Sequence, residues 1–196
     1  MIINIFIVYR NLLVVMYEII TLRDKVRVEP SRLEENNKEA VTEIIRHEYI
    51  GRIVDEKALL VGLLGIDRIE EGIIIPNDAS IYYDTVFRML AYLPTLHETV
   101  KGQISDVSEI GAIVNIGPVD GLVHISQTMD DFVDFSKNIL TGRRTKSSIK
   151  AGDTVIASII AVSTKGIMKV GLTMRSPGLG KLGSKKREVT KGSHGN

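Results

Sequence analysis

The stretch Gly102–Ser126, Gly-Gln-Ile-Ser-Asp-Val-Ser-Glu-Ile-Gly-Ala-Ile-Val-Asn-Ile-Gly-Pro-Val-Asp-Gly-Leu-Val-His-Ile-Ser, decides the fold of this chain. Apolar and polar residues alternate along it with a period of two, and glycines interrupt the alternation at Gly111, Gly117 and Gly121. Alternation predicts half-buried strands, and the glycines predict sharp bends, because a Cβ would clash where strands cross closely. We therefore predict three short, curved antiparallel strands of a small barrel, whose exposed sheet face could bind single-stranded nucleic acid.

The residues that follow this stretch supply the rest of the barrel. Gln127–Lys150 is rich in Asp, Ser, Lys and Arg without a clear period, and we expect a long connection with a short helix near Asp130–Phe135. Gly152-Asp153 predicts a turn, followed by strands at Thr154–Ser163 and Ile167–Met174. Five strands with one long loop are typical of an all-β, five-stranded OB-type barrel.

The first half of the chain predicts a different, α+β module. A strand over Tyr17–Val28 precedes Ser31-Arg32-Leu33-Glu34, a candidate capping box with Ser31 as the N-cap. The following helix ends at Gly51, a natural C-cap. Its apolar positions recur at helical spacing, at Leu33, Ala40, Val41, Ile44, Ile45 and Tyr49.

Three further strands complete this module. Ala58–Ile66 is a nearly continuous apolar run, which predicts a strand buried on both faces. Gly72–Ile75 and Ser80–Leu93 predict two more strands, separated by the turn residues Pro76-Asn77-Asp78. Strand, helix and then several strands form a small α+β domain.

Composition and charge narrow the function. Cysteine is absent, which excludes disulfides and thiolate metal sites and fits a cytoplasmic protein. The four histidines show no metal-ligand spacing, and we expect neither a metal, nor a cofactor, nor catalytic residues in this chain. Residues 1–97 carry 11 basic against 15 acidic side chains, a net −4, and residues 98–196 carry 14 against 9, a net +5. The basic half is the better candidate for binding a polyanion.

The first fifteen residues are apolar but contain Asn4, Arg10 and Asn11. The segment is too short and too interrupted to span a bilayer, and no membrane association is expected. It also fits a signal peptide poorly. Two interpretations stay open: translation starts at Met16, or residues 1–15 are an added structural element.

The Gly102–Ser126 block resembles the S1 RNA-binding domain. The resemblance rests on Ile110-Gly111-Ala112-Ile113-Val114 and on Gly121-Leu122-Val123-His124-Ile125-Ser126, where glycines, histidine and serine stand at the offsets of the S1 pattern. Other segments resemble the archaeal E-prime family of DNA-directed RNA polymerase subunits, counterparts of the seventh subunit of eukaryotic polymerase II. These segments are Met16–Ile19, Val26–Pro30, Asn115–Gly121 and Gly171–Leu182.

This resemblance implies a non-catalytic stalk subunit of the polymerase. It implies a tip domain that docks into the polymerase core, an S1 barrel that contacts single-stranded nascent RNA, and a heterodimer with the small helical F subunit of the RNA polymerase. The expected domains are an extension at 1–15, the tip domain at 16–95, the S1 barrel at 96–182 and a basic flexible tail at 183–196, with flexibility already expected from Arg175 onward. The acids Asp130, Asp131 and Asp134 lie in the expected loop, where solvated carboxylates are commoner than a metal site.

The candidate RNA-binding residues fall into two groups. Ile110 and Ile113 occupy positions where the family carries aromatic rings, which implies weaker base stacking or greater reliance on charge. His124 either contacts a base or phosphate or supports the local turn, and Ser126 is expected to close a local backbone hydrogen bond. Phosphate contacts are expected from basic residues of the second half, namely Lys101, Arg143, Arg144, Lys146, Lys169 and Arg175.

Two other classes of protein compete with the polymerase stalk. An S1-domain factor of the exosome or the translation machinery would share the central motif but not the segment Met16–Pro94. A nuclease or other enzyme would need a constellation of acids, histidines or a nucleophile, which the sequence does not display.

Overall fold

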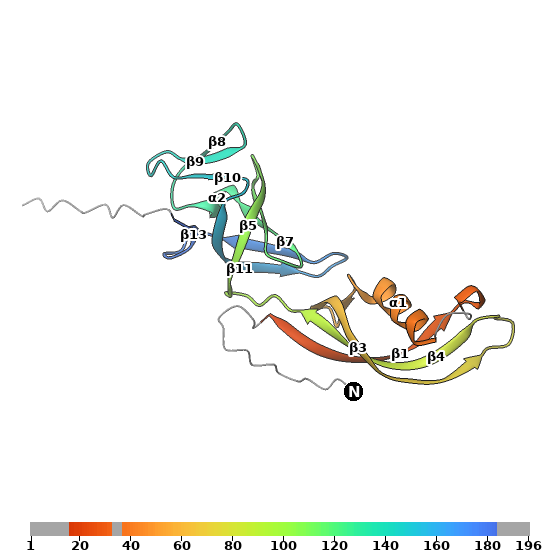
Figure 1. The fold of residues 1–196 in the computed structure, drawn as a ribbon. Coiled ribbons are helices and arrows are strands. Elements are labelled where there is room, and N and C mark those ends of the chain that lie inside the picture. Colours follow the sequence, from red (N-terminus) through yellow and green to blue (C-terminus); the bar gives the residue numbers. More distant parts are fainter. Residues whose placement is uncertain (1–15, 33–36, 184–196) are drawn as a thin grey trace, which may run out of the picture. The chain divides into compact units, whose positions relative to one another are not determined.

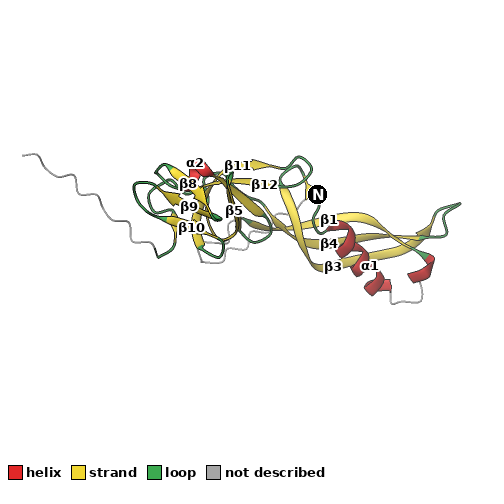
Figure 2. Ribbon diagram, turned by 90° about the horizontal axis from the view of Figure 1, so that it is seen from above, coloured by secondary structure: helices red, strands yellow, loops and turns green. Residues whose placement is uncertain are grey.

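The computed structural model describes residues 16–32 and 37–183. Contacts between residues divide the chain into two compact units: Met1–Glu98 with Ala161–Val170, which we call the tip unit, and Thr99–Ile160 with Gly171–Asn196, which we call the barrel unit. Strands dominate both units (Figure 2). No helix among the described residues is long and apolar enough to cross a membrane.

The tip unit is an antiparallel sheet with one helix on one of its faces (Figure 1). Its strands follow the order β1-β4-β3-β2. The expected α+β class is thereby confirmed. The elements are β1 (Tyr17–Val28), η1 (Pro30–Arg32), α1 (Asn37–Tyr49), β2 (Ile53–Val54), β3 (Ala58–Ile74) and β4 (Ile81–Tyr92).

Helix α1 covers the core of this unit. Its buried residues recur at helical spacing, as the sequence predicts: Ala40, Val41, Ile45 and Tyr49. The Tyr49 ring meets the Phe87 ring of β4 edge-on, with centroids 5.0 Å apart. Gly51 has φ +89°, so it ends the helix in the left-handed conformation that glycine tolerates best. Ser31 lies in η1, whereas Leu33 and Glu34 of the expected capping box lie outside the described residues.

The pairing of β3 with β4 departs from residue-for-residue register. The register shifts at four places, between Leu60 and Gly62 and at three later points, and each shift inserts one extra residue into β3. Three residues of β3 therefore lie opposite two of β4. The hydrophobic residues that β3 contributes to the core recur every third position, at Leu60, Leu63, Ile66 and Ile69.

These bulges correct two predictions. The run Ala58–Ile66 is not buried on both faces, because Leu64 is 49% exposed and most of its neighbours are half-buried. The strand expected at Gly72–Ile75 is not separate either, because β3 continues without a break to Ile74. Repeated bulges increase the local twist of a strand, and here they hide its continuity from a search for alternation.

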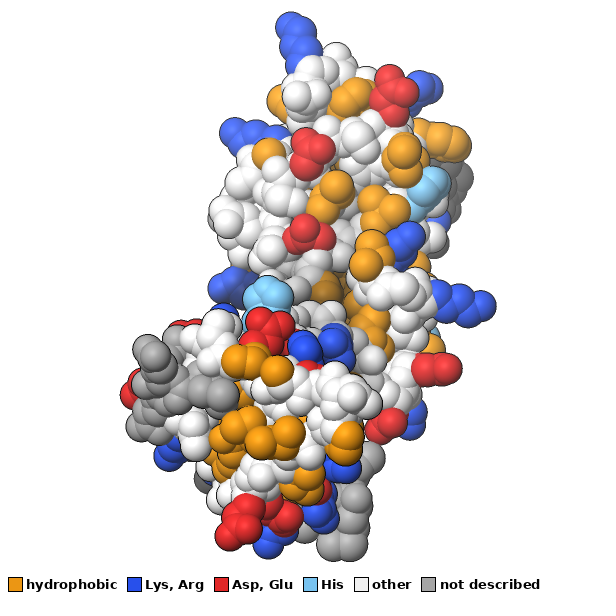
Figure 3. Space-filling model, turned by 90° about the vertical axis from the view of Figure 1, so that its right-hand side faces the viewer, with side chains coloured by type: hydrophobic (Ala, Val, Ile, Leu, Met, Phe, Trp, Pro, Cys, Tyr) orange, Lys and Arg blue, Asp and Glu red, His pale blue; other side chains and the backbone are white. Residues whose placement is uncertain are grey.

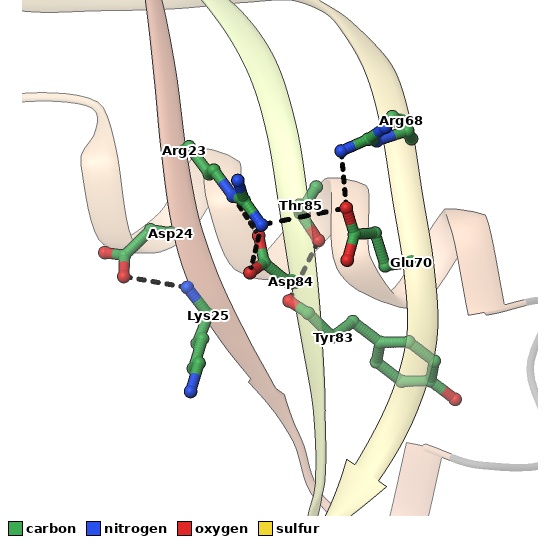
Figure 4. A network of polar contacts seen from close by, with 8 residues as sticks. All are labelled: Arg23, Asp24, Lys25, Arg68, Glu70, Tyr83, Asp84 and Thr85. Carbon is green, nitrogen blue, oxygen red and sulfur yellow. Dashed lines mark hydrogen bonds and ion pairs between the residues drawn. The ribbon is translucent and has the colours of Figure 1, made fainter. Parts of the chain in front are cut away.

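Charged side chains link three strands on the other face of this sheet (Figure 4). Arg23 of β1 donates to both carboxylate oxygens of Asp84 on β4, each at 2.8 Å, and lies 3.7 Å from Glu70 on β3. Arg68 also pairs with Glu70. Since side chains alternate along a strand, Asp84 points away from the core face to which Tyr83 contributes. The network therefore belongs to the polar face of the sheet.

The barrel unit is built on a closed five-stranded barrel. Its strands follow the order β12-β7-β6-β5-β11, and β12 also pairs with β11, which closes the circle. The predicted OB-type barrel is confirmed. Its strands are β5 (Thr99–Ser108), β6 (Gly111–Asn115), β7 (Asp120–His124), β11 (Thr154–Ser163) and β12 (Lys169–Thr173).

Gly111 occupies a corner where two strands cross closely. Its φ is +149°, and a Cβ at this position would lie 2.0 Å from the carbonyl oxygen of Val123. Only glycine fits such an approach, as the sequence predicts for this motif.

Residues beyond Arg175 are partly ordered, contrary to the expected flexible tail. Strand β13 (Gly180–Lys181) pairs with β11, and the Leu182 amide donates to the Thr154 carbonyl at 2.9 Å. Lys181 also forms an ion pair of 2.8 Å with Asp153. The part of the predicted tail from residue 184 onward lies outside the described residues.

The segment expected to be an irregular connection forms a small sheet instead. Its order is β10-β9-β8, with β8 (Val133–Ser136), β9 (Ile139–Gly142) and β10 (Ser148–Lys150). A two-residue turn joins β8 to β9, with Lys137 and Asn138 both at positive φ, which is the tight-hairpin geometry. The short helix α2 (Ile125–Thr128) precedes this sheet, earlier than the expected helix near Asp130–Phe135.

Candidate nucleic-acid interface

The outer surface of β6 and β7 carries aliphatic side chains beside the exposed polar residues Asn115, Asp120 and His124. Ile113 and Leu122 are register partners on neighbouring strands; Ile113 is half-buried and Leu122 is 43% exposed. Ile110 lies in the turn between β5 and β6 and is 63% exposed. Ala112 and Val123 fill the barrel beneath them. This face offers apolar contact to a base but no phenylalanine, tyrosine or tryptophan ring on which it could stack, and the exposed imidazole of His124 stands at the end of β7.

His124 ends β7 and caps α2. Its Nδ1 accepts a hydrogen bond from the Ser126 amide at 3.3 Å and lies 2.9 Å from the Ser126 hydroxyl. A neutral ring that accepts at Nδ1 carries its proton on Nε2. His124 therefore supports the local turn and still has a donor for an external group. The Ser126 hydroxyl contacts this side chain, and among the described residues no hydrogen bond from it to a backbone carbonyl is seen.

Three of the predicted phosphate-contacting residues line one open groove beside α2. Arg143, Arg144 and Arg175 lie there, although 32 positions separate the first from the last in the sequence. The groove is lined by these arginines together with Ile125, Ser126, Asp130, Asp131, Phe132 and Val133. We call it the α2 groove.

Carboxylates hold two of these arginines in place. Arg143 donates hydrogen bonds to both carboxylate oxygens of Asp134, at 2.8 and 2.6 Å. These hydrogen bonds lower the pKa of the Asp134 carboxyl. Arg175 donates to Asp130 at 2.9 Å. The Arg144 guanidinium donates to the backbone carbonyl of Asp130 at 3.2 Å. The acids therefore orient the guanidinium groups and offset part of their charge.

Asp131 organises the backbone of the groove. Its Oδ2 accepts from the amides of Arg144 and Thr145 at 2.9 and 2.7 Å, and its Oδ1 accepts from the Phe132 amide at 2.7 Å. Hydrogen bonding from Thr145 lowers the pKa of this carboxyl. The three acids considered as a metal site are thus engaged by N–H donors, and no metal-holding cluster of acids and histidines occurs among the described residues.

The remaining predicted residues lie apart from this groove. Lys101 on β5 pairs in register with Ile156 of β11, and Lys169 begins β12. Lys146 lies in the hairpin between β9 and β10, with φ +57°. None of the three lines the α2 groove.

Phe132 is the groove residue that sequence reasoning missed. Its side chain is 81% exposed, the largest exposed fraction among the exposed large hydrophobic residues of the described chain. In Asp131-Phe132-Val133-Asp134-Phe135, aromatic residues stand beside acidic ones within a polar segment, and this was the indication that the sequence offered.

Family models match both parts of the chain. Residues 23–79 match the SHS2 domain found in the N terminus of Rpb7p/Rpc25p, and residues 93–168 match the S1 RNA binding domain. An SHS2 domain of this kind followed by an S1 domain defines the class, a two-domain protein with an Rpb7-type N terminus.

Related proteins identify the family within this class. The DNA-directed RNA polymerase subunit Rpo7 of Sulfolobus acidocaldarius is 37% identical over 91% of this chain and 100% of its own length. The Rpo7 subunit of Saccharolobus solfataricus is 36% identical over 85% of this chain and 96% of its length. The RNA polymerase III subunit rpc8 of Schizosaccharomyces pombe is 30% identical over 55% of this chain and 53% of its own. The chain belongs to the Rpo7 family of RNA polymerase subunits.

Proposed function

We propose that this polymerase subunit is part of the stalk, docks into the polymerase core through its tip unit and contacts nascent single-stranded RNA through its barrel unit. Its immediate partner in this proposal is the small helical F subunit, its location is the cytoplasm, and catalysis belongs to other subunits. Membership of the Rpo7 family supports the assignment to the polymerase. One feature of the tip unit supports the docking role.

That feature is an apolar end of the β3–β4 hairpin. Ile73, Ile74 and Ile75 follow one another and are 57%, 67% and 44% exposed. Figure 3 looks from the side on which this hairpin ends in Figure 1, and shows hydrophobic side chains gathered among charged ones on the tip unit. Burying one such side chain in a partner stabilises a complex by about 1.5–3 kcal/mol before the entropic cost of association.

Hydrogen bonds hold the adjoining turn in one conformation, which favours docking without rearrangement. Asp78 accepts from the Ser80 amide at 2.9 Å and from the Tyr82 hydroxyl at 2.6 Å, and Arg27 approaches it at 3.4 Å. These hydrogen bonds hold the pKa of Asp78 well below its usual range, and the one from Tyr82 has the largest effect. A turn that is ordered in advance loses little conformational entropy on binding.

Reconstitution of the polymerase from its subunits tests the docking role. Ile73→Asp combined with Ile74→Asp should strongly reduce incorporation, because two charges would have to be buried in the interface. Leu64→Asp is the matched control, since Leu64 is 49% exposed on the same strand but distant from the hairpin end. Equal incorporation of the double variant and the wild type would refute docking through this end of the tip unit.

A titration with fluorescent single-stranded RNA tests the other role. We expect weak binding with little sequence preference, and an affinity that falls steeply as salt rises, because the contacts are mainly with phosphates. Ile110→Tyr with Ile113→Phe should tighten binding by roughly 1–3 kcal/mol if bases cross this face. Sequence-specific binding that ignores salt would contradict the proposal.

Co-purification from cells separates this function from the alternative of an exosome or translation factor. The proposal requires polymerase subunits to accompany the chain. Recovery with exosome or ribosomal components alone would favour the alternative.

A further inference from the structure

We propose that Phe132 in the α2 groove is the stacking platform for a nucleobase of single-stranded RNA, with the groove arginines beside it contacting the adjacent phosphate. This inference rests on the proposed RNA contact of the barrel unit and names the place where that contact is made. It differs from the expectation that RNA crosses the β6–β7 face through Ile110 and Ile113.

The aromatic residues of the second half of the chain point to Phe132. Residues 99–196 contain two phenylalanines, Phe132 and Phe135, and no tyrosine or tryptophan. Phe135 is half-buried and paired in register with Leu140, whereas Phe132 is 81% exposed. Base stacking on an aromatic side chain is the main sequence-tolerant source of affinity for single strands. Of these two phenylalanines, Phe132 is the one that offers an open face for it.

The exposed Phe132 side chain is carried by a backbone segment that hydrogen bonds hold in place. The Phe132 amide donates to Asp131 at 2.7 Å, and its carbonyl accepts from the Arg143 amide at 2.8 Å. Asp131 in turn holds the amides of Arg144 and Thr145. Gly142 allows this tight packing, because a Cβ there would lie 2.7 Å from the Asp131 carboxylate and 2.6 Å from the Thr145 hydroxyl. The ring is thus presented in advance of binding, which lowers the entropy lost when a base stacks on it.

The polar groups of the groove suit a phosphate next to that base. Arg144 contacts a backbone carbonyl, so its charge is not offset by a direct carboxylate contact among the hydrogen bonds of its guanidinium. Arg143 is oriented by Asp134 and Arg175 by Asp130, and a planar guanidinium held in this way retains further donors. Ser126 adds a hydroxyl to the same groove. An aromatic ring beside guanidinium groups fits a nucleotide better than it fits an apolar peptide.

The test uses the full chain in its complex with the F subunit and a single-stranded RNA that carries 2-aminopurine, whose fluorescence is quenched on stacking. Phe132→Ala should weaken binding about five- to 150-fold and reduce the quenching. Phe132→Trp should restore both. Ile160→Ala is the matched control, since Ile160 is 44% exposed on β11 of the same unit, and its binding should equal that of the wild type.

Each outcome distinguishes the inference from the proposed function. If Phe132→Ala binds RNA as tightly as the wild type does and quenches 2-aminopurine equally, the role of Phe132 is overturned. The proposed RNA contact of the barrel unit would then still stand. Unchanged RNA binding together with impaired incorporation into polymerase would make Phe132 a protein contact, and would equally overturn the inference. Absence of RNA binding by the wild type overturns the proposed RNA contact and this inference with it.

Discussion

Both units are built on antiparallel sheets, but the curvature of their strands arises in different ways. In the barrel unit, β6 pairs with β7 residue for residue, β5 pairs with β6 with a single register shift, and Gly111 occupies a close corner. In the tip unit, curvature is distributed along β3, which gains one residue over β4 at each of four shifts. A corner that needs one glycine is sensitive to substitution at that one position. A strand that bends at every third residue spreads its core over many side chains.

The largest effect is expected at the barrel corner. In Gly111→Ala the added methyl would lie 2.0 Å from a backbone carbonyl oxygen, and a backbone at φ +149° disfavours alanine as well. Overpacking and backbone strain together should lower the free energy of unfolding by roughly 3–5 kcal/mol, measured in urea. Gly152→Ala is the control, because Gly152 also has positive φ but has nothing within 4 Å of its Cβ position. Equal losses in both variants would show that close approach is not what requires glycine at 111.

The distributed curvature of β3 predicts which leucines carry the tip core. Leu60→Ala removes a fully buried side chain and should cost about 2–5 kcal/mol of unfolding free energy. Leu63→Ala should cost somewhat less, because Leu63 is only partly buried against the core. Simple alternation would instead place Leu64 on the same face as Leu60. Since Leu64 is 49% exposed, Leu64→Ala should cost less than about 1 kcal/mol. A larger loss at Leu64 than at Leu63 in denaturant unfolding would contradict the three-to-two register.

An alkaline transition should report on the tip unit. Burial raises the pKa of Tyr92 to about 12, and the neighbouring Tyr17 and Glu98 add to the shift. A raised folded-state pKa stabilises the fold below the ordinary value of 10 and loses that contribution as the pH rises toward the folded value. Stability should therefore fall by up to about 2–3 kcal/mol between pH 10 and 12. Tyr92→Phe, followed by circular dichroism, should flatten this fall; an unchanged pH profile would assign the transition to other groups.

The smallest expected effect is local to the α2 groove. Asp131→Asn weakens the hydrogen bonds that hold the amides of Arg144 and Thr145, so these amides should exchange faster with solvent while global stability changes little. Because the pKa of Asp131 is lowered, its ordering contribution is present above the ordinary carboxyl value of 3.8 and is lost as the pH falls through the lower folded value. Hydrogen exchange followed by NMR measures this, with Asp106→Asn on β5 as the control. Unchanged protection of both amides would show that Asp131 does not organise the groove.

Long strands were predictable from the sequence where apolar and polar residues alternate along them. The expected ranges Tyr17–Val28 and Thr154–Ser163 coincide with β1 and β11, because ten or more residues are enough for a period to show. Strands β8, β9 and β10 have three or four residues each, which is too few for a period, and the segment was expected to be irregular. The extent and burial of strand β3 were predicted wrongly for the opposite reason. The strand is long, but its bulges convert a period of two into a period of three.

The sequence predicted which types of residue form the candidate site better than it predicted how these residues are arranged in space. Arg143, Arg144 and Arg175 were expected from charge, and the fold does bring them into one groove. Their carboxylate partners were not foreseen, because Arg175 meets Asp130 across 45 positions of sequence and such pairs follow only from the folded chain. Phe132 was missed because exposure of an aromatic side chain is a property of the surface and has no periodic pattern.

The bulges of β3 also bear on how this protein remains separate from other sheets. Beyond Leu60 no described strand pairs with the outer edge of β3, since β2 reaches only Ala58 and Leu59. A straight edge of this length would offer evenly spaced N–H and C=O groups to any extended peptide, and would invite aggregation. With an extra residue at every third position the spacing of these groups is uneven, and an incoming strand cannot stay in register for more than a few residues. The irregularity that shapes the tip core therefore also protects an open sheet edge from unintended partners.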